Sequence, residues 1–307
     1  MRSRLPVSRA VPARSRTRWC WSTEAGVSTV ANNAAFGAER QFEFRDTDFA
    51  RVRSMIHARA GISLGAHKRE MAYSRLARRL RALGAHDFTA YLDDLERDAS
   101  APEWEDFVNA LTTNLTAFFR EAHHFPILAE FARGRPGPVS VWCCAASTGE
   151  EPYSIAITLA EALGSKAGNS RVYATDIDTN CLNRASSAIY AWERVAKISE
   201  ERLRRYFLRG KGSHEGQVKV RPELSAMVEF ASLNLLASSW PIQEKFDAIF
   251  CRNVMIYFDK PTQAKILRRF APLLKPGGLL FAGHSENFTY ISQDFRLRGQ
   301  TVYECAA

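Results

Sequence analysis

The sequence predicts an α/β fold in which a helical region precedes a mostly parallel sheet. Three observations support this prediction. The pattern of apolar residues from about 41 to 135 is helical. After residue 138, short apolar runs alternate with helical stretches, which is typical of βαβ units. The first of these runs leads through a loop of small residues into a helix, as in nucleotide-binding folds.

The bulk composition is that of a globular protein of 307 residues, 46% of them hydrophobic. Its apolar runs are far shorter than the roughly 20 residues of a membrane span. The net charge of +9 is uneven, because residues 1–38 combine six arginines with Glu24 alone. This segment lacks the apolar core of a secretory signal, so we expect a disordered basic tail or a start codon placed too early.

The six cysteines follow no CxxC or disulfide-framework spacing. We expect reduced, buried thiols in a cytoplasmic protein. His123 and His124 have neither the spacing nor a paired cysteine motif for zinc, so no metal is predicted.

The predicted N-terminal helical domain covers residues 39–113. Its first helix has Asp46 or Thr47 as the expected N-cap and ends at Gly61. A second helix covers about 67–83, and two more follow at about 87–98 and 102–113. One flank of the second helix carries three basic side chains that form either a docking surface or a solvated face; they are Lys68, Arg75 and Arg79. A linker and cofactor-contacting segment, 114–138, ends in the Gly/Pro-rich stretch 134–138.

The α/β domain is predicted over residues 139–307. The expected core strands are 139–144, 171–175, 246–251 and 278–283, and the expected helices are 151–163, 178–187 and 260–274. Strands 217–220 and 227–233 are expected in an insertion of about 209–232, reached through a basic helix at 199–209. Residues 295–305 would form a terminal strand pair or edge.

The loop after the first strand is the first chemical signal. Small residues such as Ala145 and Gly149 allow a ligand to approach the backbone, and Pro152 favours a helix start. Glu150 and Glu151 would compete with a phosphate for the helix N-terminus. A cationic ligand with an amino group and a sulfonium centre fits better, which indicates S-adenosylmethionine.

Two later strand ends complete the predicted site. Asp176 ends the second strand, where doubly wound folds place an acid that accepts ribose hydroxyls, whereas Asp178 is expected to cap the next helix. The strand at 246–251 delivers Cys251 and Arg252 to the same edge. The Asn/Asp-Pro-Pro-Tyr motif of methyltransferases that act on nucleic-acid amino groups is absent, and Arg252 is suited to orienting a carboxylate. Tyr257 is read either as part of this site or as amphipathic packing.

Together these stretches resemble the CheR family of chemotaxis receptor methyltransferases over about residues 40–304. Six segments in the family's order carry the resemblance: 114–120, 145–153, 174–178, 233–236, 251–259 and 276–286. The resemblance implies a small all-α domain, a Rossmann-like methyltransferase domain and a small antiparallel β-subdomain inserted in it. It implies an enzyme that esterifies receptor glutamates, with S-adenosylmethionine as methyl donor and S-adenosylhomocysteine as product.

The same resemblance assigns residues to the site. The cofactor-lining set that it implies, with the loop residues above, is Asn114, Thr116, Arg120, Ala145, Gly149, Glu151, Asp176, Asn234, Leu235, Cys251 and Arg252. Arg120, Arg252 and Tyr257 would lie near the transferable methyl group. Residues 209–224 resemble family members that bind a C-terminal pentapeptide of the receptor. A monomer without nucleic-acid binding or membrane insertion is expected.

Two other functions stay open from the residues alone. A nucleic-acid methyltransferase is suggested by the positive charge, although much of that charge lies in the tail. A degenerate domain that only senses S-adenosylmethionine is the non-enzymatic alternative, and the intact Arg120, Arg252 and Tyr257 argue against it.

Overall fold

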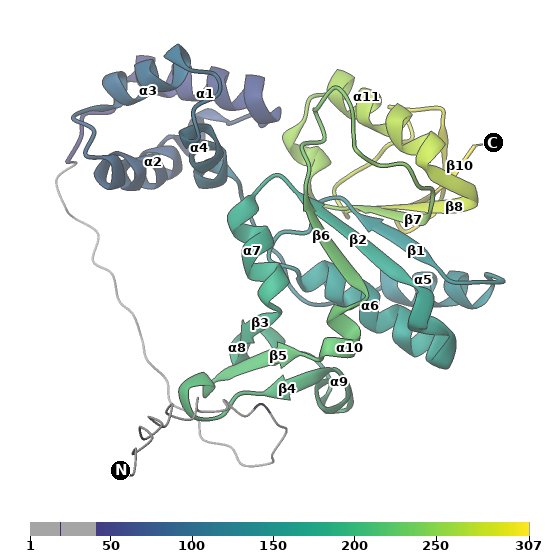
Figure 1. The fold of residues 1–307 in the computed structure, drawn as a ribbon. Coiled ribbons are helices and arrows are strands. Elements are labelled where there is room, and N and C mark those ends of the chain that lie inside the picture. Colours follow the sequence, from purple (N-terminus) through teal and green to yellow (C-terminus); the bar gives the residue numbers. More distant parts are fainter. Residues whose placement is uncertain (1–18, 20–40, 307) are drawn as a thin grey trace, which may run out of the picture.

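The computed structural model describes Trp19 and residues 41–306. The predicted tail, 1–38, therefore lies outside the described residues apart from Trp19. In the described part, an all-α domain stands above one end of a large sheet, and a small second sheet lies below it (Figure 1).

Four helices make the all-α domain. They are α1 (Asp46–Ala60), α2 (Arg69–Leu83), α3 (Phe88–Arg97) and α4 (Glu103–Leu111), with a 3-10 turn at Ala66–Lys68 before α2. The N-cap of α1 is Arg45, so the prediction of Asp46 or Thr47 as the N-cap is wrong, whereas α1 ends at Gly61 as predicted, with a φ of 68°. The helices enclose a core of fully buried side chains such as Ile56, Leu76 and Phe107. This core gives the domain its own stabilisation by apolar burial.

The large sheet has seven strands in the order β6-β2-β1-β7-β8-β10-β9. Their bounds are β1 (Ser140–Cys143), β2 (Arg171–Asp176), β6 (Val228–Ser232), β7 (Phe246–Cys251), β8 (Leu274–Ala282), β9 (Phe295–Gly299) and β10 (Val302–Cys305). The first five in the sheet order are parallel, and β10 and β9 form the predicted terminal antiparallel pair. The α/β prediction with a mostly parallel sheet is confirmed.

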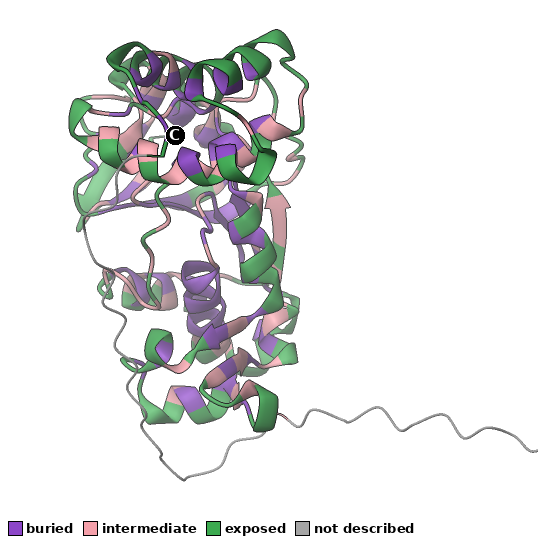
Figure 2. Cartoon of the chain, turned by 90° about the vertical axis from the view of Figure 1, so that its left-hand side faces the viewer, coloured by how far each residue is buried: buried purple, intermediate pink, exposed green. Residues whose placement is uncertain are grey.

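Helices cover both faces of this sheet. Its main helices are α5 (His124–Arg133), α6 (Glu150–Leu163), α7 (Thr179–Ser187) and α11 (Lys260–Phe270). Along β1, Val141 and Cys143 join the core under α5 and α6, whereas Trp142 joins the core under α11. Alternate side chains of one strand point to opposite faces, so a continuous apolar run is what a sheet buried on both sides requires. Figure 2 shows the buried residues on the inner faces of the elements and the exposed residues on the outer faces.

The small sheet corrects one prediction. Its three antiparallel strands have the order β3-β5-β4, with bounds β3 (Ile189–Ala191), β4 (Phe207–Arg209) and β5 (Gln217–Val220), and the short helices α8 (Trp192–Val195), α9 (Glu200–Tyr206) and α10 (Pro222–Ser225) accompany it. The strand expected at 227–233 was wrongly placed in this insertion. It is β6, which pairs in parallel with β2 from Val172↔Val228 onwards. A short apolar run shows that a strand forms but not which sheet edge it joins.

No helix among the described residues is long and apolar enough to cross a membrane.

Candidate active site

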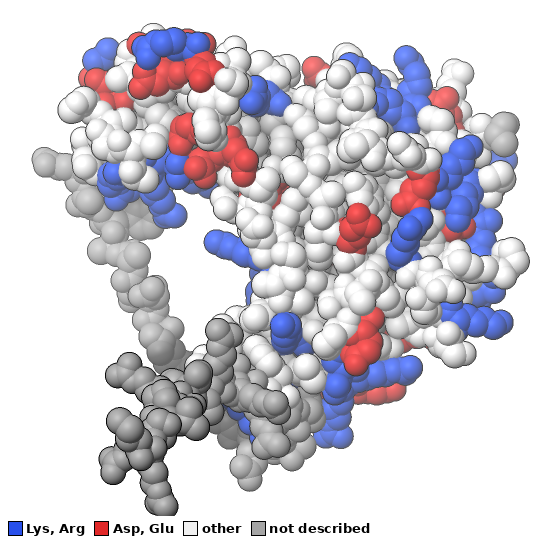
Figure 3. Space-filling model, viewed as in Figure 1, with Lys and Arg blue, Asp and Glu red and all other residues white. Residues whose placement is uncertain are grey.

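A cavity lies where the carboxyl ends of the parallel strands face the all-α domain. In the space-filling view the open space lies below the helical domain and beside the body of the molecule (Figure 3). Ligands of open α/β sheets bind at this edge. Two backbone-directed hydrogen bonds join the domains beside the cavity: Ser63 N donates to the Tyr257 carbonyl over 3.1 Å, and Asn234 Nδ2 donates to the Arg59 carbonyl over 2.9 Å.

Most of the predicted site residues lie on the wall of this one cavity. They are Asn114, Thr116, Arg120, Ala145, Glu151, Asp176, Asn234, Leu235, Arg252 and Tyr257, joined by Lys68 of the predicted docking flank. Gly149 and Cys251 are not on the wall. Cys251 is fully buried at the end of β7, where it packs in the core with Cys144 and Trp142.

The loop between β1 and α6 owes its glycine to packing. Gly149 has a φ of 95°, and a Cβ there would lie 2.6 Å from Tyr190 Oη and 2.9 Å from Ala185 Cβ. The sequence reading attributed this small residue to ligand approach. The structure instead gives the close contact with β3 and α7 as the reason, because any side chain would collide there.

Two aspartates fix the next strand end. Asp176 accepts hydrogen bonds from Ser147 N over 2.7 Å and from Asp178 N over 2.9 Å. It therefore holds the loop 144–149 between β1 and α6, the predicted cofactor loop, beside β2. Burial raises the pKa of Asp176. Asp178 caps α7 by accepting from Cys181 N over 3.0 Å, which confirms its predicted role. Its second oxygen accepts from Asn114 Nδ2 over 2.7 Å and thereby fixes the linker.

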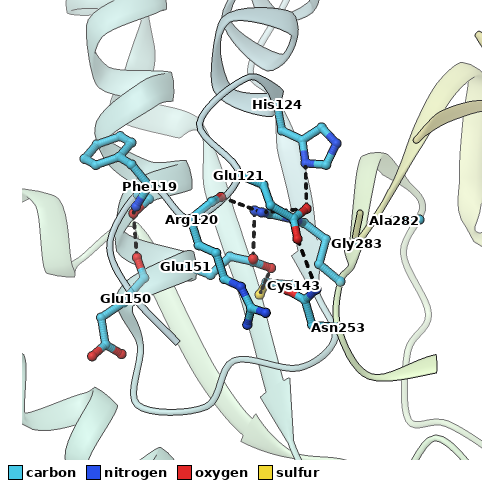
Figure 4. Close-up of polar contacts among 12 residues, drawn as sticks. Phe119, Arg120, Glu121, His124, Cys143, Glu150, Glu151, Asn253, Ala282 and Gly283 are labelled. Carbon is cyan, nitrogen blue, oxygen red and sulfur yellow. Dashed lines mark hydrogen bonds and ion pairs between the residues drawn. The ribbon is translucent and has the colours of Figure 1, made fainter. Parts of the chain in front are cut away.

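Arg252 is the centre of a buried ion-pair network. Its Nη1 lies 2.9 Å from Glu151 Oε2, its Nη2 lies 3.2 Å from Glu121 Oε2, and it donates to the Arg120 carbonyl. Figure 4 labels these partners, Arg120, Glu121 and Glu151, which lie close together. Burial raises the pKa of Glu151, and Arg252 opposes that rise. The sequence reading had Arg252 orient a substrate carboxylate. Because two internal carboxylates already flank the guanidinium, we correct that role to holding Glu151 and Glu121 in place.

The charges at the start of α6 are likewise compensated. Arg194 of α8 pairs with Glu150, with 3.0 Å between Nε and Oε1, and also donates to the Thr116 carbonyl over 2.9 Å. Each of the two glutamates that seemed to repel a phosphate therefore has an arginine partner. The electrostatic argument against phosphate is weaker than the sequence suggested. Arg194, in the short helix α8 beside the small sheet, thus connects that part of the chain to the start of α6 and to the linker.

Arg120 is the arginine of the predicted catalytic set that no carboxylate pairs with in the described ion pairs. Its Nη1 donates to the Leu115 carbonyl over 2.8 Å, and its side chain is partly exposed. Tyr257 lies in a 3-10 turn, Met255–Tyr257, on the same wall. Arg120 and Tyr257 are thus the predicted catalytic side chains with polar groups left for a ligand.

The basic flank of α2 is divided between two tasks. Arg79 pairs with Glu103 at 2.6 Å and with Asp106 at 2.8 Å, and Arg75 Nη1 donates to the Ala110 carbonyl over 3.2 Å. Both arginines therefore fasten α2 to α4. Lys68 alone of the three lines the cavity.

Three polar residues at the site were missed by sequence reasoning. Glu121 pairs with Arg252, and His124, which is fully buried, has its Nε2 2.9 Å from the Gln300 carbonyl. Burial lowers the pKa of His124 to about 4. Glu286 is buried and accepts backbone hydrogen bonds from the turn after β7. A signal existed for two of them, since Glu286 ends the segment 276–286 and Glu121 directly follows 114–120, whereas His124 lies in none of the segments that carry the resemblance.

Among the described residues, no three or more His, Cys, Asp or Glu side chains gather as a metal site would need.

The fold and cavity define a class: an α/β protein with a cavity at the carboxyl edge of its parallel strands, beneath an all-α domain. Comparison with known families identifies the member. Residues 47–112 match the all-alpha domain of CheR methyltransferases, and residues 114–304 match their SAM binding domain. The chain belongs to the CheR methyltransferase family and is an S-adenosylmethionine-dependent methyltransferase.

Relatives are similar over nearly their whole length. A chemotaxis protein methyltransferase of Klebsiella aerogenes is 66% identical over 92% of this chain and 97% of its own. That of Salmonella typhimurium is 62% identical over 84% of this chain and 90% of its own. Chemotaxis protein methyltransferase 2 of Pseudomonas aeruginosa is 50% identical over 91% of this chain and 99% of its own.

Proposed function

We propose that this enzyme transfers the methyl group of S-adenosylmethionine to glutamate side chains of methyl-accepting chemoreceptors, forming methyl esters for chemotactic adaptation. The observation that carries the proposal is the single cavity that combines Asp176 and Glu151 with Arg120 and Tyr257. The first pair suits the donor, and the second pair suits an acidic acceptor.

The residues present fit the methyl donor. Asp176 keeps lone pairs for the ribose hydroxyls beside its two backbone contacts, and Glu151 offers negative charge to the amino group or the sulfonium centre. Asn114, Thr116, Asn234 and Leu235 complete the wall against the nucleoside and methionine parts. When bound, S-adenosylmethionine supplies a methyl group on a positively charged sulfur leaving group.

The proposed methyl transfer requires alignment of the two reactants but no proton transfer. A glutamate carboxylate has a reference pKa of about 4.3, so it is already ionised at neutral pH and needs no general base. Its oxygen forms a bond to the methyl carbon while the carbon–sulfur bond breaks, and the electron pair leaves on sulfur. Alignment of two bound reactants can supply roughly 7–11 kcal/mol of the barrier.

Arg120 would orient the acceptor carboxylate, since Arg252 is held by Glu151 and Glu121. A loose contact serves this purpose best, because a tight ion pair in the ground state would lower the nucleophilicity of the carboxylate. Tyr257 would donate a hydrogen bond to the nucleophile or close the methyl pocket. Lys68 would meet the acidic surface of the receptor at the mouth of the cavity.

The small sheet would bind the C-terminal pentapeptide of those receptors that carry one. Its outer strands β3 and β4 each pair only with β5 within the described sheet, which leaves an edge to which an extended peptide can add. We further propose that the protein acts in the cytoplasm as a monomer.

The test combines binding with transfer. Calorimetry with S-adenosylmethionine measures cofactor binding, and receptor-containing membranes incubated with the radiolabelled donor should release labelled methanol on mild base treatment. Binding without label transfer would instead favour a cofactor sensor. Label in added nucleic acid would favour the other enzyme class.

A further inference from the structure

The turn after β7 is gathered around one buried carboxylate. Glu286 Oε1 accepts hydrogen bonds from Val254 N over 3.0 Å and Met255 N over 2.8 Å, while Oε2 accepts from Asn253 N over 2.8 Å and Gly283 N over 2.5 Å. Both oxygens are thus used by backbone donors. Carboxylates that accept backbone N–H groups make stronger hydrogen bonds than neutral acceptors.

The backbone of this turn passes through a left-handed residue. Asn253 has a φ of 58°, a conformation that Asn adopts more readily than most residues with a side chain. Its side-chain Nδ2 donates to Glu121 Oε1 over 3.1 Å (Figure 4). Asn253 is therefore held between two carboxylates: Glu286 accepts from its backbone N–H, and Glu121 accepts from its side chain.

Gly283 closes the arrangement from the neighbouring strand. A Cβ at this position would lie 2.4 Å from Asn253 Nδ2, 2.7 Å from Glu286 Oε2 and 2.8 Å from Asn253 N. Only glycine permits the end of β8 to approach the turn so closely.

The turn forms the part of the cavity wall where we propose that methyl transfer takes place. Arg252 precedes it, Asn253 and Val254 line the cavity, and Tyr257 follows within one 3-10 turn. The Tyr257 carbonyl is also fastened to Ser63 of the all-α domain. A shift at Asn253 would therefore move Tyr257 relative to both the cofactor loop and the all-α domain.

We infer that Glu286 is a positioning residue for methyl transfer, which acts through the turn 253–255 to place Tyr257 beside the methyl donor. This inference rests on the proposed function for its substrate. In-line displacement depends steeply on geometry, and a displacement of about 1 Å can cost roughly 100-fold in rate. Cofactor binding depends more on the Asp176 and Glu151 side of the cavity, which Glu286 does not contact in the described hydrogen bonds.

The test uses Glu286→Gln in the full chain. Its amide would present N–H to backbone donors, so we expect kcat to fall roughly 30- to 100-fold while the Kd for S-adenosylhomocysteine stays within about threefold. Hydrogen exchange of the amides of residues 253–255 should accelerate in the same variant. Gly283→Ala displaces the same turn while retaining the carboxylate, so it should give the same signature and serves if the first variant folds poorly.

Asp247→Asn is the matched control. Asp247 is equally buried at the other end of β7, where it accepts from Ser140 N over 2.9 Å and from Lys275 Nζ over 2.7 Å. The Asp247→Asn variant should have a lower free energy of unfolding with little change in kcat. The inference is overturned if the kcat of Glu286→Gln stays within threefold of wild type, or if hydrogen exchange of the amides of 253–255 is unchanged. It is also overturned if Glu286→Gln and Asp247→Asn, at equal loss of stability, lose the same amount of kcat. Wild-type protein that binds cofactor but esterifies no glutamate would instead contradict the proposed function, and the exchange result would still decide this inference.

Discussion

Arg252 and Glu151 form an ion pair inside the protein, with 2.9 Å between Nη1 and Oε2. The guanidinium is also flanked by Glu121, so the side chain that looked like a substrate-binding cation belongs to the internal support of the site. The consequence for the mechanism is a division of labour. Arg252 holds Glu151 and Glu121 in place, and Arg120, which lines the cavity, is the arginine that we propose to orient the acceptor.

Removal of Arg252 should therefore damage stability as well as activity. Arg252→Met leaves the buried Glu151 and the partly buried Glu121 without their cation, and breaking a buried pair in this way costs about 3–5 kcal/mol. Urea unfolding measures the loss. The control is Arg204→Met, because Arg204 pairs with Glu200 on the surface of α9 and should contribute less than about 1 kcal/mol. Equal losses in the two variants would contradict the buried network.

Asp176→Asn should weaken cofactor binding. The variant loses the charge and one of the two acceptors that serve Ser147 N and Asp178 N, as well as the expected ribose contact. A hydrogen bond to a charged group is worth about 1.5–3 kcal/mol, so calorimetry should find Kd raised roughly 10- to 100-fold. Asp259→Asn removes the charge of an exposed helix cap at α11, where Asn can still accept from Thr262 N, and should leave Kd unchanged. A Kd for the Asp176 variant within twofold of wild type would remove Asp176 from the site.

Tyr257→Phe separates the two roles of that side chain. If the hydroxyl donates to the nucleophile, kcat should fall about five- to tenfold, the equivalent of one hydrogen bond, with the KM for S-adenosylmethionine unchanged. Tyr290→Phe alters a side chain that is 95% exposed and should have no effect. Unchanged turnover of the Tyr257 variant would reject the hydroxyl role and leave only a packing role.

Lys68→Ala should raise the KM for receptor membranes several-fold at low salt and less at physiological salt, because the contact is electrostatic. Lys166→Ala is the control, because Lys166 lies in the 3-10 helix Gly164–Asn169 after α6 and does not line the cavity. Charge reversal at Arg79 should instead lower the unfolding free energy, since it breaks the pairs with Glu103 and Asp106. A Lys68 variant with wild-type KM under both conditions would exclude this docking point.

His124 predicts a pH dependence of stability. Burial holds its pKa at about 4, below the ordinary value of 6.5, so the folded protein keeps it neutral. Below pH 6.5 the unfolded chain binds the proton more readily, and stability is lost progressively as pH falls from about 6.5 to 4. Glu121, Arg252 and His123 also act on this imidazole. The loss attributable to His124 should reach roughly 3 kcal/mol and be absent in His124→Gln, which can still donate to the Gln300 carbonyl. Parallel pH profiles for the two proteins would contradict this account.

Local pattern was sufficient for much of the fold. The strand 246–251 and the end of α1 at Gly61 lie where the sequence predicts them, because apolar runs and a left-handed glycine are local signals. The partner of β6 is a long-range property, so its sheet was predicted wrongly. Local and long-range signals differ in the same way at the site. The end of a predicted strand was enough to place Asp176 at the edge of the sheet, where it lines the cavity. The pairing of Arg252 with Glu121, and of Glu286 with Asn253 33 residues earlier, depends on the folded chain.

The central claim is that glutamate side chains receive the methyl group. Its most direct test is mass spectrometry of receptor peptides after incubation of the full chain with receptor membranes and methyl-deuterated S-adenosylmethionine. The account predicts deuterated methyl esters on glutamate side chains, removed by mild base and absent with the Asp176→Asn protein at limiting cofactor. Deuterium on lysine, arginine or nucleic acid, or no transfer by protein that binds the cofactor, would contradict it.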